Sequence, residues 1–367
     1  MKKIALVFLG DHSYDARCIN MINSLAKKNH LLSIYSTGKT KNSLFNNHKI
    51  NEYNVSFYSI PFIKYFFWLF RVYCLLRQES YDIVIAADIY SLIPTCLLSK
   101  KVSIIYDSRE IYTKLSVHFN RPITNWLIYC FEKSCIKRTD KIIVTAPSDQ
   151  QYLQKKYNLC SLPFCTIYNF PSSSFVFQKS SFLKDKLNIP KNTTLLLYQG
   201  VIQKNRGLLQ LIKIIKKTKK TAGVIIGTGS YVKVLNKHIE KNNLQDRFFI
   251  LSAVPYHKLL QITSSADIGV SLVRPVGLSN LYALPNKLFE YALSGLPTLA
   301  SDLPNIKKYV NKYHLGWCVN DTDLFSQIKI IKNYQSRGFS FSAFNSCKNL
   351  FSWESQERAF NGFVLDE

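Results

Sequence analysis

The chain of 367 residues carries 48 lysines and arginines against 23 aspartates and glutamates, a formal net charge of +25 at pH 7. Its 47% of hydrophobic and 14% of aromatic residues can fill packed cores, which excludes a disordered protein. At ~100–200 residues per domain the length predicts two domains, and no segment holds the ~20 apolar residues of a membrane span. The excess of positive charge favours phosphates or an anionic membrane as partners.

The cysteines point to a reducing compartment. They are nine, an odd number, without a CxxC pair and without a histidine at ligand spacing, so we expect neither a disulfide framework nor a zinc site. The chain begins with Met1-Lys2-Lys3 and continues directly into Ile4–Leu9, an apolar run too short for a signal peptide. We interpret this run as a strand and the protein as cytoplasmic.

Short apolar runs alternate with helical patterns, which is typical of parallel α/β sheets. In the first half the predicted strands lie near Ile4–Leu9, Leu31–Tyr35, Ile83–Ala86, Val102–Tyr106 and Lys141–Thr145. In the second half they lie near Leu195–Gln199, Gly223–Ile226, Arg247–Leu251, Asp267–Leu272, Pro297–Ala300 and Gly316–Val319. A Pro/Ser-rich stretch, 168–174, separates the halves and predicts an interdomain connection.

The stretch 277–304 is the most informative part of the second half. Pro285 fits the first turn of a helix that ends at Gly295. Within this helix the Glu290 carboxylate either lies in solvent or reaches into a cleft. Backbone amides around Ala283–Asn286, if they open the helix, would point at an anion and favour a diphosphate.

The segment Pro285–Tyr291, followed by Ser294–Pro297, resembles the nucleotide-sugar site of the retaining glycosyltransferases of family 4. The resemblance implies the α/β GT-B fold, in which two Rossmann-like domains face each other across a cleft. It also implies an acceptor-side domain at 1–170, a donor domain at 171–345 and a terminal helix at 346–367 that crosses back to the first domain. In that family, the glutamate at the position of Glu290 holds the ribose hydroxyls of the nucleotide.

Other segments of the second half resemble further donor-binding parts of that family. Tyr198–Gly207 is similar to its strand, glycine loop and cation, Gly227–Gly229 to its glycine turn, and Leu251–Pro255 to the segment whose backbone reads the base. By themselves, a single arginine before a helix is usually solvated and a GxG is usually a turn. The donor-binding residues that the resemblance implies are Gly200, Arg206, Gly227, Val254, Tyr282, Ala283, Leu284, Asn286, Lys287 and Glu290.

The loop after the first strand resembles the acceptor-side loop of the family. The resemblance implies that Gly10, Asp11, His12 and Arg17 lie on the acceptor side, together with Asp107. A glycine permits close approach of the backbone to a ligand. A histidine in a loop is more often exposed than catalytic, so both interpretations of His12 stay open.

Arg109 and Glu110 follow the predicted strand Val102–Tyr106, at the edge of the sheet where cleft residues belong. Many relatives carry Asp, His and Glu in sequence here, and Arg109 stands where their histidine would be. Arginine is permanently charged and cannot act as a general base. We assign Arg109 and Glu110 to the catalytic site, with a structural salt-bridge network as the alternative.

Two further features concern acids and metals. Many relatives have a second glutamate eight positions before the one at Glu290, whereas this chain has Tyr282. Asp321-Thr322-Asp323 is similar to the metal-binding motif of another transferase fold, but it precedes a predicted helix and is interpreted as a helix cap. We expect no essential metal and no cofactor, with Arg206, Lys287 and helix dipoles neutralising the leaving diphosphate.

The most aromatic region of the chain is 60–77, which three cations interrupt: Lys64, Arg71 and Arg77. This pattern fits a helix in a bilayer interface, and it also fits a buried core helix. The net charge favours peripheral contact with an anionic membrane at the inner face of the cytoplasmic membrane.

The resemblance implies a glycosyltransferase that moves a sugar from a nucleotide sugar to a glycan or lipid-linked acceptor with retention. The composition, rich in Lys and Asn, suggests a bacterial enzyme of lipopolysaccharide, capsule or other surface-glycan assembly. The alternatives are a noncatalytic membrane- or polyanion-binding protein with the same fold and a sugar-nucleotide epimerase. No specific nucleic-acid partner is expected, because the charges are scattered and no known nucleic-acid motif occurs.

Overall fold

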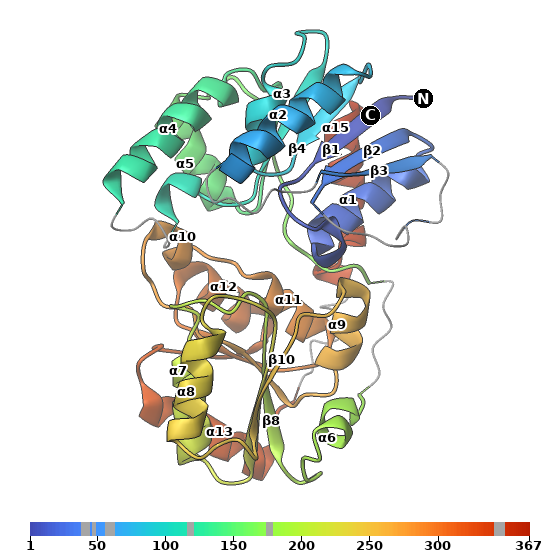
Figure 1. Cartoon of the computed structure of the whole chain (residues 1–367). Helices are drawn as coiled ribbons and strands as arrows, with labels where there is room; N and C mark the ends of the chain where they lie inside the picture. Colours follow the sequence, from blue (N-terminus) through green and yellow to red (C-terminus); the bar gives the residue numbers. More distant parts are fainter. Residues whose placement is uncertain (38–44, 46–48, 56–62, 116–120, 174–178, 341–348) are drawn as a thin grey trace. The chain divides into compact units, whose positions relative to one another are not determined.

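A computed structural model of the chain describes residues 1–37, 45, 49–55, 63–115, 121–173, 179–340 and 349–367 (Figure 1). The chain divides into two compact units. Unit 1 comprises Met1–Asn169 and Gln356–Glu367, and unit 2 comprises Phe170–Ser355. Each is built on a parallel sheet, so the predicted architecture of two α/β domains is confirmed.

Within the described residues, the sheet of unit 1 has seven parallel strands in the order β3-β2-β1-β4-β5-β6-β7. Their bounds are β1 (Lys3–Val7), β2 (Leu31–Ser36), β3 (Ile50–Asn54), β4 (Ile83–Ala86), β5 (Ser103–Ser108), β6 (Lys141–Val144) and β7 (Phe164–Thr166). The two edge strands, β3 and β7, were not among the strands predicted from the sequence. β3 is mostly polar and none of its residues is buried, and β7 has only three residues, so neither forms a long apolar run.

Helices cover both sides of this sheet. They are α1 (Ala16–Lys27), α2 (Ile63–Arg77), α3 (Ile89–Thr95), α4 (Pro122–Ile136), α5 (Pro147–Tyr157) and α15 (Glu354–Leu365), with 3-10 turns η1 (His12–Tyr14) and η2 (Tyr112–Lys114). On one side, α2 packs Trp68 and Val72 against Tyr35 and Val84. On the other side lie α1 and α15, which are joined through hydrogen bonds from Ser24 and Lys27 to Glu357 (Figure 1).

Unit 2 repeats the scheme with a sheet in the order β10-β9-β8-β11-β12-β13, as far as the described residues show. The strands are β8 (Thr194–Gln199), β9 (Thr221–Ile226), β10 (Phe248–Leu251), β11 (Ile268–Ser271), β12 (Thr298–Ser301) and β13 (Gly316–Val319). The helices are α6 (Phe182–Lys186), α7 (Leu208–Lys217), α8 (Val232–Lys241), α9 (Tyr256–Thr263), α10 (Leu278–Leu281), α11 (Asn286–Leu293), α12 (Pro304–Tyr313) and α13 (Leu324–Arg337). All eleven strands predicted from the apolar runs are present in the two sheets.

The helix α11 lies directly on its sheet because the strand beneath it has no side chain at the crossing point. A Cβ atom at Gly269 of β11 would lie 2.2 Å from the ring of Tyr291. The Tyr291 hydroxyl donates to the carbonyl of Leu197 at 3.0 Å and accepts from the amide of Gln199 at 3.2 Å. Tyr291 therefore fixes α11 across β8 and β11.

Substitution Gly269→Ala is expected to lower the free energy of unfolding of unit 2 by about 1–3 kcal/mol, because the added methyl group displaces the Tyr291 ring. Chemical denaturation measures the effect. Gly362→Ala on α15 is the control: a Cβ there meets only the terminal Glu367 carbonyl, at 3.2 Å, so stability should change little. Equal effects of the two substitutions would contradict tight packing at Gly269.

Candidate functional site

The carboxylate of Glu290 lies inside unit 2. Glu290 is only 6% exposed, so the interpretation that its carboxylate lies in solvent is wrong. Gln199, the last residue of β8, donates from Nε2 to Glu290 Oε2 at 2.5 Å. Thr263 in turn donates to Gln199 Oε1 at 2.7 Å, which fixes the orientation of the amide. The sequence does not identify Gln199 and Thr263 as partners of Glu290, because they lie on other elements.

Burial raises the pKa of Glu290 above its ordinary value. Hydrogen bonds from Gln199 and Tyr256, together with the charge of Lys287, oppose this rise. The carboxylate thus sits in a low-dielectric environment with defined donors around it. Such a group can accept hydrogen bonds from two neighbouring hydroxyls of a ligand.

Lys287, one turn earlier on α11, is also buried, and its ammonium lies 3.8 Å from the centroid of the Tyr198 ring. Burial and the nearby positive charge of Arg206 lower the pKa of Lys287 to about 7, although Glu290 acts in the opposite direction. Over the part of the chain that the structure describes, neither Lys287 nor Arg206 forms an ion pair. Two adjacent cations that form no ion pair with a carboxylate can bind an anionic ligand.

Two glycine loops bring backbone close to these cations. A Cβ at Gly200 would lie 3.5 Å from Lys287 Nζ, and a Cβ at Gly227 would lie 1.9 Å from the Gly200 carbonyl oxygen. The amide of Gly200 bonds Ile226 and that of Gly227 bonds Leu251, so both loops continue from the carboxyl ends of neighbouring strands. In open parallel sheets ligands bind at this edge.

The other predicted donor residues lie in loops of the same unit or, for Asn286, at the start of α11. Tyr282, Ala283 and Leu284 connect α10 to α11, and the Tyr282 carbonyl accepts from Asn305 at 2.6 Å. Asn286 is exposed in the first turn of α11, whose amides lack acceptors inside the helix. Val254 is half-buried after β10.

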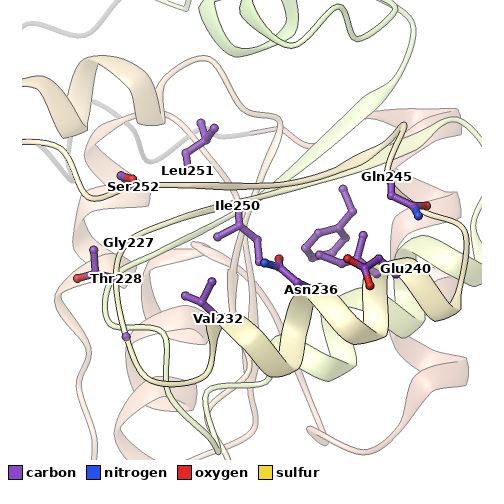
Figure 2. Close-up of a pocket in the computed structure, with 12 residues that line it drawn as sticks. Gly227, Thr228, Val232, Asn236, Glu240, Gln245, Ile250, Leu251 and Ser252 are labelled. Carbon is purple, nitrogen blue, oxygen red and sulfur yellow. The ribbon is translucent and has the colours of Figure 1, made fainter.

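A cavity of about 520 Å³ begins at the glycine turn and runs along α8 and the edge strand β10. In Figure 2, Thr228 and Ser252 lie at one end, Ile250 and Asn236 in the middle, and Glu240 and Gln245 at the other end. It shares Gly227 with the predicted donor residues, whereas Lys287 and Glu290 lie outside its lining.

In unit 1 the predicted acceptor-side and catalytic residues form an ion-pair network. Arg17 contacts both carboxylate oxygens of Asp107, the shortest at 2.6 Å, and donates to the Ile167 carbonyl at 2.6 Å. Arg109 donates to Asp107 at 2.9 Å and to Asp15 at 2.9 Å. This geometry is that of the structural salt-bridge network, the alternative that the sequence left open for this cluster.

All members of this network except Asp15 are largely shielded from solvent. Burial alone would raise the pKa of Asp107, but Arg17 and Arg109 hold that pKa below its ordinary value. The third donor of Arg109 reaches Cys18 Sγ at 3.1 Å, and its guanidinium lies 4.8 Å from the Phe8 ring centroid. Glu110, the next residue in the chain, is exposed.

The structure corrects one interpretation in the loop after β1. His12 is buried, so its interpretation as an exposed loop residue is wrong. One ring nitrogen lies 2.8 Å from Ser36 Oγ and the other 3.0 Å from Glu52 Oε2. Asp11 caps the turn η1 by accepting from the Ser13 amide, and Gly10 is half-buried.

Asp323 is a helix cap, as the sequence predicts, because its side chain accepts from the Ser326 amide at the start of α13. Asp321 pairs with Arg274 at 3.1 Å.

The eight cysteines within the described residues are free thiols, as expected. No helix in the described ranges is long and apolar enough to span a membrane.

The two α/β domains, each built on a parallel sheet, match the GT-B glycosyltransferase fold. Residues 16–171 match the model "Glycosyltransferase Family 4" and residues 179–334 match "Glycosyl transferases group 1". The two glycosyltransferase models thus match successive parts of the chain, in agreement with its two domains. No curated protein matches it in sequence.

Solved structures share the fold over nearly the whole chain. Sucrose-phosphate synthase from Thermosynechococcus elongatus is 16% identical, with a TM-score of 0.80 and coverage of 100% of this chain and 99% of that one. HepE from Anabaena, in complex with UDP-glucose, is 15% identical with a TM-score of 0.75 and full coverage of both chains. WaaG, a glycosyltransferase involved in lipopolysaccharide biosynthesis, is 12% identical with a TM-score of 0.71, covering 98% and 99%.

Substitution Asp107→Ala should lower the free energy of unfolding by about 3–5 kcal/mol, because two buried guanidinium groups lose their shared carboxylate. Asp302→Ala, which breaks an exposed pair with Lys307, should cost about 0–1 kcal/mol. The pKa of Asp107 is lower in the folded state than its unfolded value of about 3.9. The stability that Asp107 contributes is therefore fully present above the unfolded pKa and is lost as pH falls through the folded pKa.

Denaturation curves between pH 3 and pH 7 measure both effects. The wild-type protein should lose stability on acidification more steeply than the Asp107 variant. A similar acid dependence in the two proteins would contradict the assigned network.

Proposed function

We propose that the protein transfers a sugar from a nucleoside-diphosphate sugar to an acceptor hydroxyl with retention at the anomeric carbon. The observation that carries this proposal is the pair Lys287 and Arg206, two cations without an ion-pair partner in the described residues, next to the buried carboxylate of Glu290. This set combines a site for a diphosphate with an acceptor for ribose hydroxyls. A purely structural cluster would be expected to neutralise its own charges.

In the proposal, unit 2 binds the donor. Glu290 accepts hydrogen bonds from the ribose, Arg206 and Lys287 bind the diphosphate, and the loop 282–286 contacts phosphate and sugar through its backbone. Gly200 and Gly227 allow close approach of the diphosphate, and Val254 contributes backbone contacts to the base. HepE, which shares the fold, was solved with UDP and with UDP-glucose, so UDP-glucose is the first donor to test.

The proposed reaction breaks the bond between the anomeric carbon and the diphosphate oxygen. The acceptor oxygen bonds to the same face of the sugar, and the leaving phosphate takes the acceptor proton. Arg206, Lys287 and the first turn of α11 stabilise the negative charge that develops on the diphosphate, without an essential metal or cofactor.

On the acceptor side, Gly10, Asp11, His12, Arg17 and Asp107 shape the loops in this proposal. Glu110 is the exposed carboxylate proposed to reach the substrate. Arg109, whose donors are held by Asp107, Asp15 and Cys18, is proposed to position that loop.

We further propose a cytoplasmic role in surface-glycan assembly, such as lipopolysaccharide or capsule, with a glycan or lipid-linked acceptor at the inner face of the membrane. The net charge of +25 supports this location, because anionic lipids attract such a protein. WaaG, another protein of this fold, is involved in lipopolysaccharide biosynthesis.

A thermal-shift panel of nucleoside diphosphates and nucleotide sugars, run in the presence of EDTA, tests the donor site. One base should raise the melting temperature, because a selective ligand stabilises the native state by RT ln(1 + [L]/Kd). Glu290→Ala and Arg206→Ala should each weaken binding about 10-fold or more, whereas Lys213→Ala on the exposed side of α7 should not. A folded protein whose melting temperature rises with no member of the panel would contradict the proposed donor site.

The affinity for UDP-glucose should depend on pH through Lys287, whose pKa is about 7 in the free protein. A bound diphosphate raises that pKa, so binding takes up a proton above pH 7. The dissociation constant should therefore be flat below pH 7 and rise by up to about tenfold per pH unit above it. Calorimetry in buffers of different ionisation enthalpy measures the proton uptake.

Lys287→Met should bind UDP-glucose more weakly and with no such pH dependence, since the titrating group is gone. A UDP-sugar is the suitable ligand because its diphosphate does not titrate in this range. The same pH dependence in wild type and variant would contradict a role for Lys287.

A further inference from the structure

The helix α4 exposes a second apolar face that no core covers in the described structure. Its inner side contributes Ile128, Tyr129 and Ile136 to the core of unit 1. Its outer side carries Ile123, Trp126, Leu127 and Phe131, with exposed fractions of 74%, 62%, 43% and 50%. This spacing places the outer residues on one side of the helix.

The helix α2 repeats this arrangement. Trp68, Val72 and Leu76 are buried against the sheet, whereas Phe66 and Phe70 are 74% and 65% exposed. Of the two alternatives that the sequence left open for this segment, the core helix describes its inner side, and the contact with a bilayer stays a prediction. The inner side is a core helix, and the outer side presents aromatic residues.

The two helices belong to one surface. α3 lies between them, and α2, α3 and α4 all cover the same side of the sheet of unit 1 (Figure 1). The rings of Tyr65 on α2 and Tyr90 on α3 are stacked with centroids 5.9 Å apart, and each is 40% exposed. We call the outer surface of α2, α3 and α4 the helical face. Exposed apolar patches of this kind mark interaction surfaces.

The exposed charges on α2, α3 and α4 themselves are all positive. Exposed cations on or beside its helices are Arg71, Arg77, Arg121, Lys133 and Lys137. The only acidic residue within α2, α3 and α4 is Glu132. It is buried and accepts hydrogen bonds from Tyr106 and Tyr157, so these helices present no exposed carboxylate.

We propose that the helical face binds an anionic lipid bilayer, with Trp126 and Phe131 of α4 and Phe66 and Phe70 of α2 inserted among the headgroups. Aromatic rings beside cations, without exposed acids, match an interface of apolar chains and negative headgroups. A second copy of this chain would place like charges against each other, which disfavours a dimer through this face. The inference rests on the proposed function, because a lipid-linked acceptor makes the contact useful.

Vesicle flotation tests the proposal with phosphatidylglycerol/phosphatidylcholine vesicles and with phosphatidylcholine alone. Wild type should bind the anionic vesicles, and binding should weaken as salt is added. The double variant Trp126→Ser/Phe131→Ser should bind at least about tenfold more weakly. Phe325→Ser on α13 of unit 2 removes a ring that is 78% exposed elsewhere and should bind like wild type.

Tryptophan fluorescence gives a second measurement. Trp68 and Trp353 are buried and Trp317 is half-buried, so Trp126 is the most exposed of the four tryptophans. Anionic vesicles should shift the emission of wild type to shorter wavelength. Trp126→Phe should abolish that shift while it retains most of the binding.

Equal binding by the wild type and the double variant would overturn the assigned face, as would equal binding to neutral vesicles. Sedimentation that shows a wild-type dimer, dissociated by the double variant, would assign the face to a second copy instead. The UDP-glucose thermal shift separates the two proposals, since it should persist in the double variant. A retained shift without vesicle binding refutes only the membrane face, and vesicle binding without any shift refutes only the donor site.

Discussion

The packing of α11 against β8 and β11 decides the chemistry of unit 2, because it carries two ionisable side chains into the interior. A buried charge is costly unless partners replace water. Glu290 has such a partner in Gln199, held by Thr263. Lys287 packs against the face of the Tyr198 ring, and burial together with the repulsion of Arg206 lowers its pKa to about 7. Unit 2 therefore has too little negative charge beside these two cations, and a bound anion would offset the electrostatic cost of burying Lys287.

The charged cluster of unit 1 shows the opposite balance. Asp107 lies between Arg17 and Arg109, Asp15 takes a further donor of Arg109, and the low pKa of Asp107 follows from these contacts. Its arginines have acceptors of their own, so the network needs no ligand to be stable. Both clusters are equally conspicuous in the sequence. What distinguishes a structural from a binding role is whether the charges are compensated within the protein, and only the folded arrangement provides that information.

The sequence predicts what depends on local pattern and misses what depends on contacts between distant elements. The strands that form apolar runs were all predicted, including the partly solvated edge strands β10 and β13. The edge strands β3 and β7 were not, because β3 is mostly polar and β7 has only three residues. The helix containing Glu290 was predicted, but its burial depends on Gln199, ninety-one positions away. His12 was interpreted from its loop, although Ser36 and Glu52 hold it inside. The outer face of α4 was not recognised, since a helix apolar on two sides does not reveal which side the core takes.

The topology of unit 1 connects the loops proposed to bind the acceptor with its exposed aromatic face. In a parallel sheet every strand ends at the same edge, so the loops after β1 and β5, with Gly10 and Glu110, lie at the edge where α3 and α4 begin. Tyr65, in the first turn of α2, is stacked on Tyr90 in the first turn of α3, so that end of α2 is at the same edge. A bilayer on the helical face that extends to these first turns would bring its headgroups next to the loops proposed to bind the acceptor. The parallel arrangement of the strands thus places the first turns of α2, α3 and α4 beside the loops that are proposed to receive a lipid-linked acceptor.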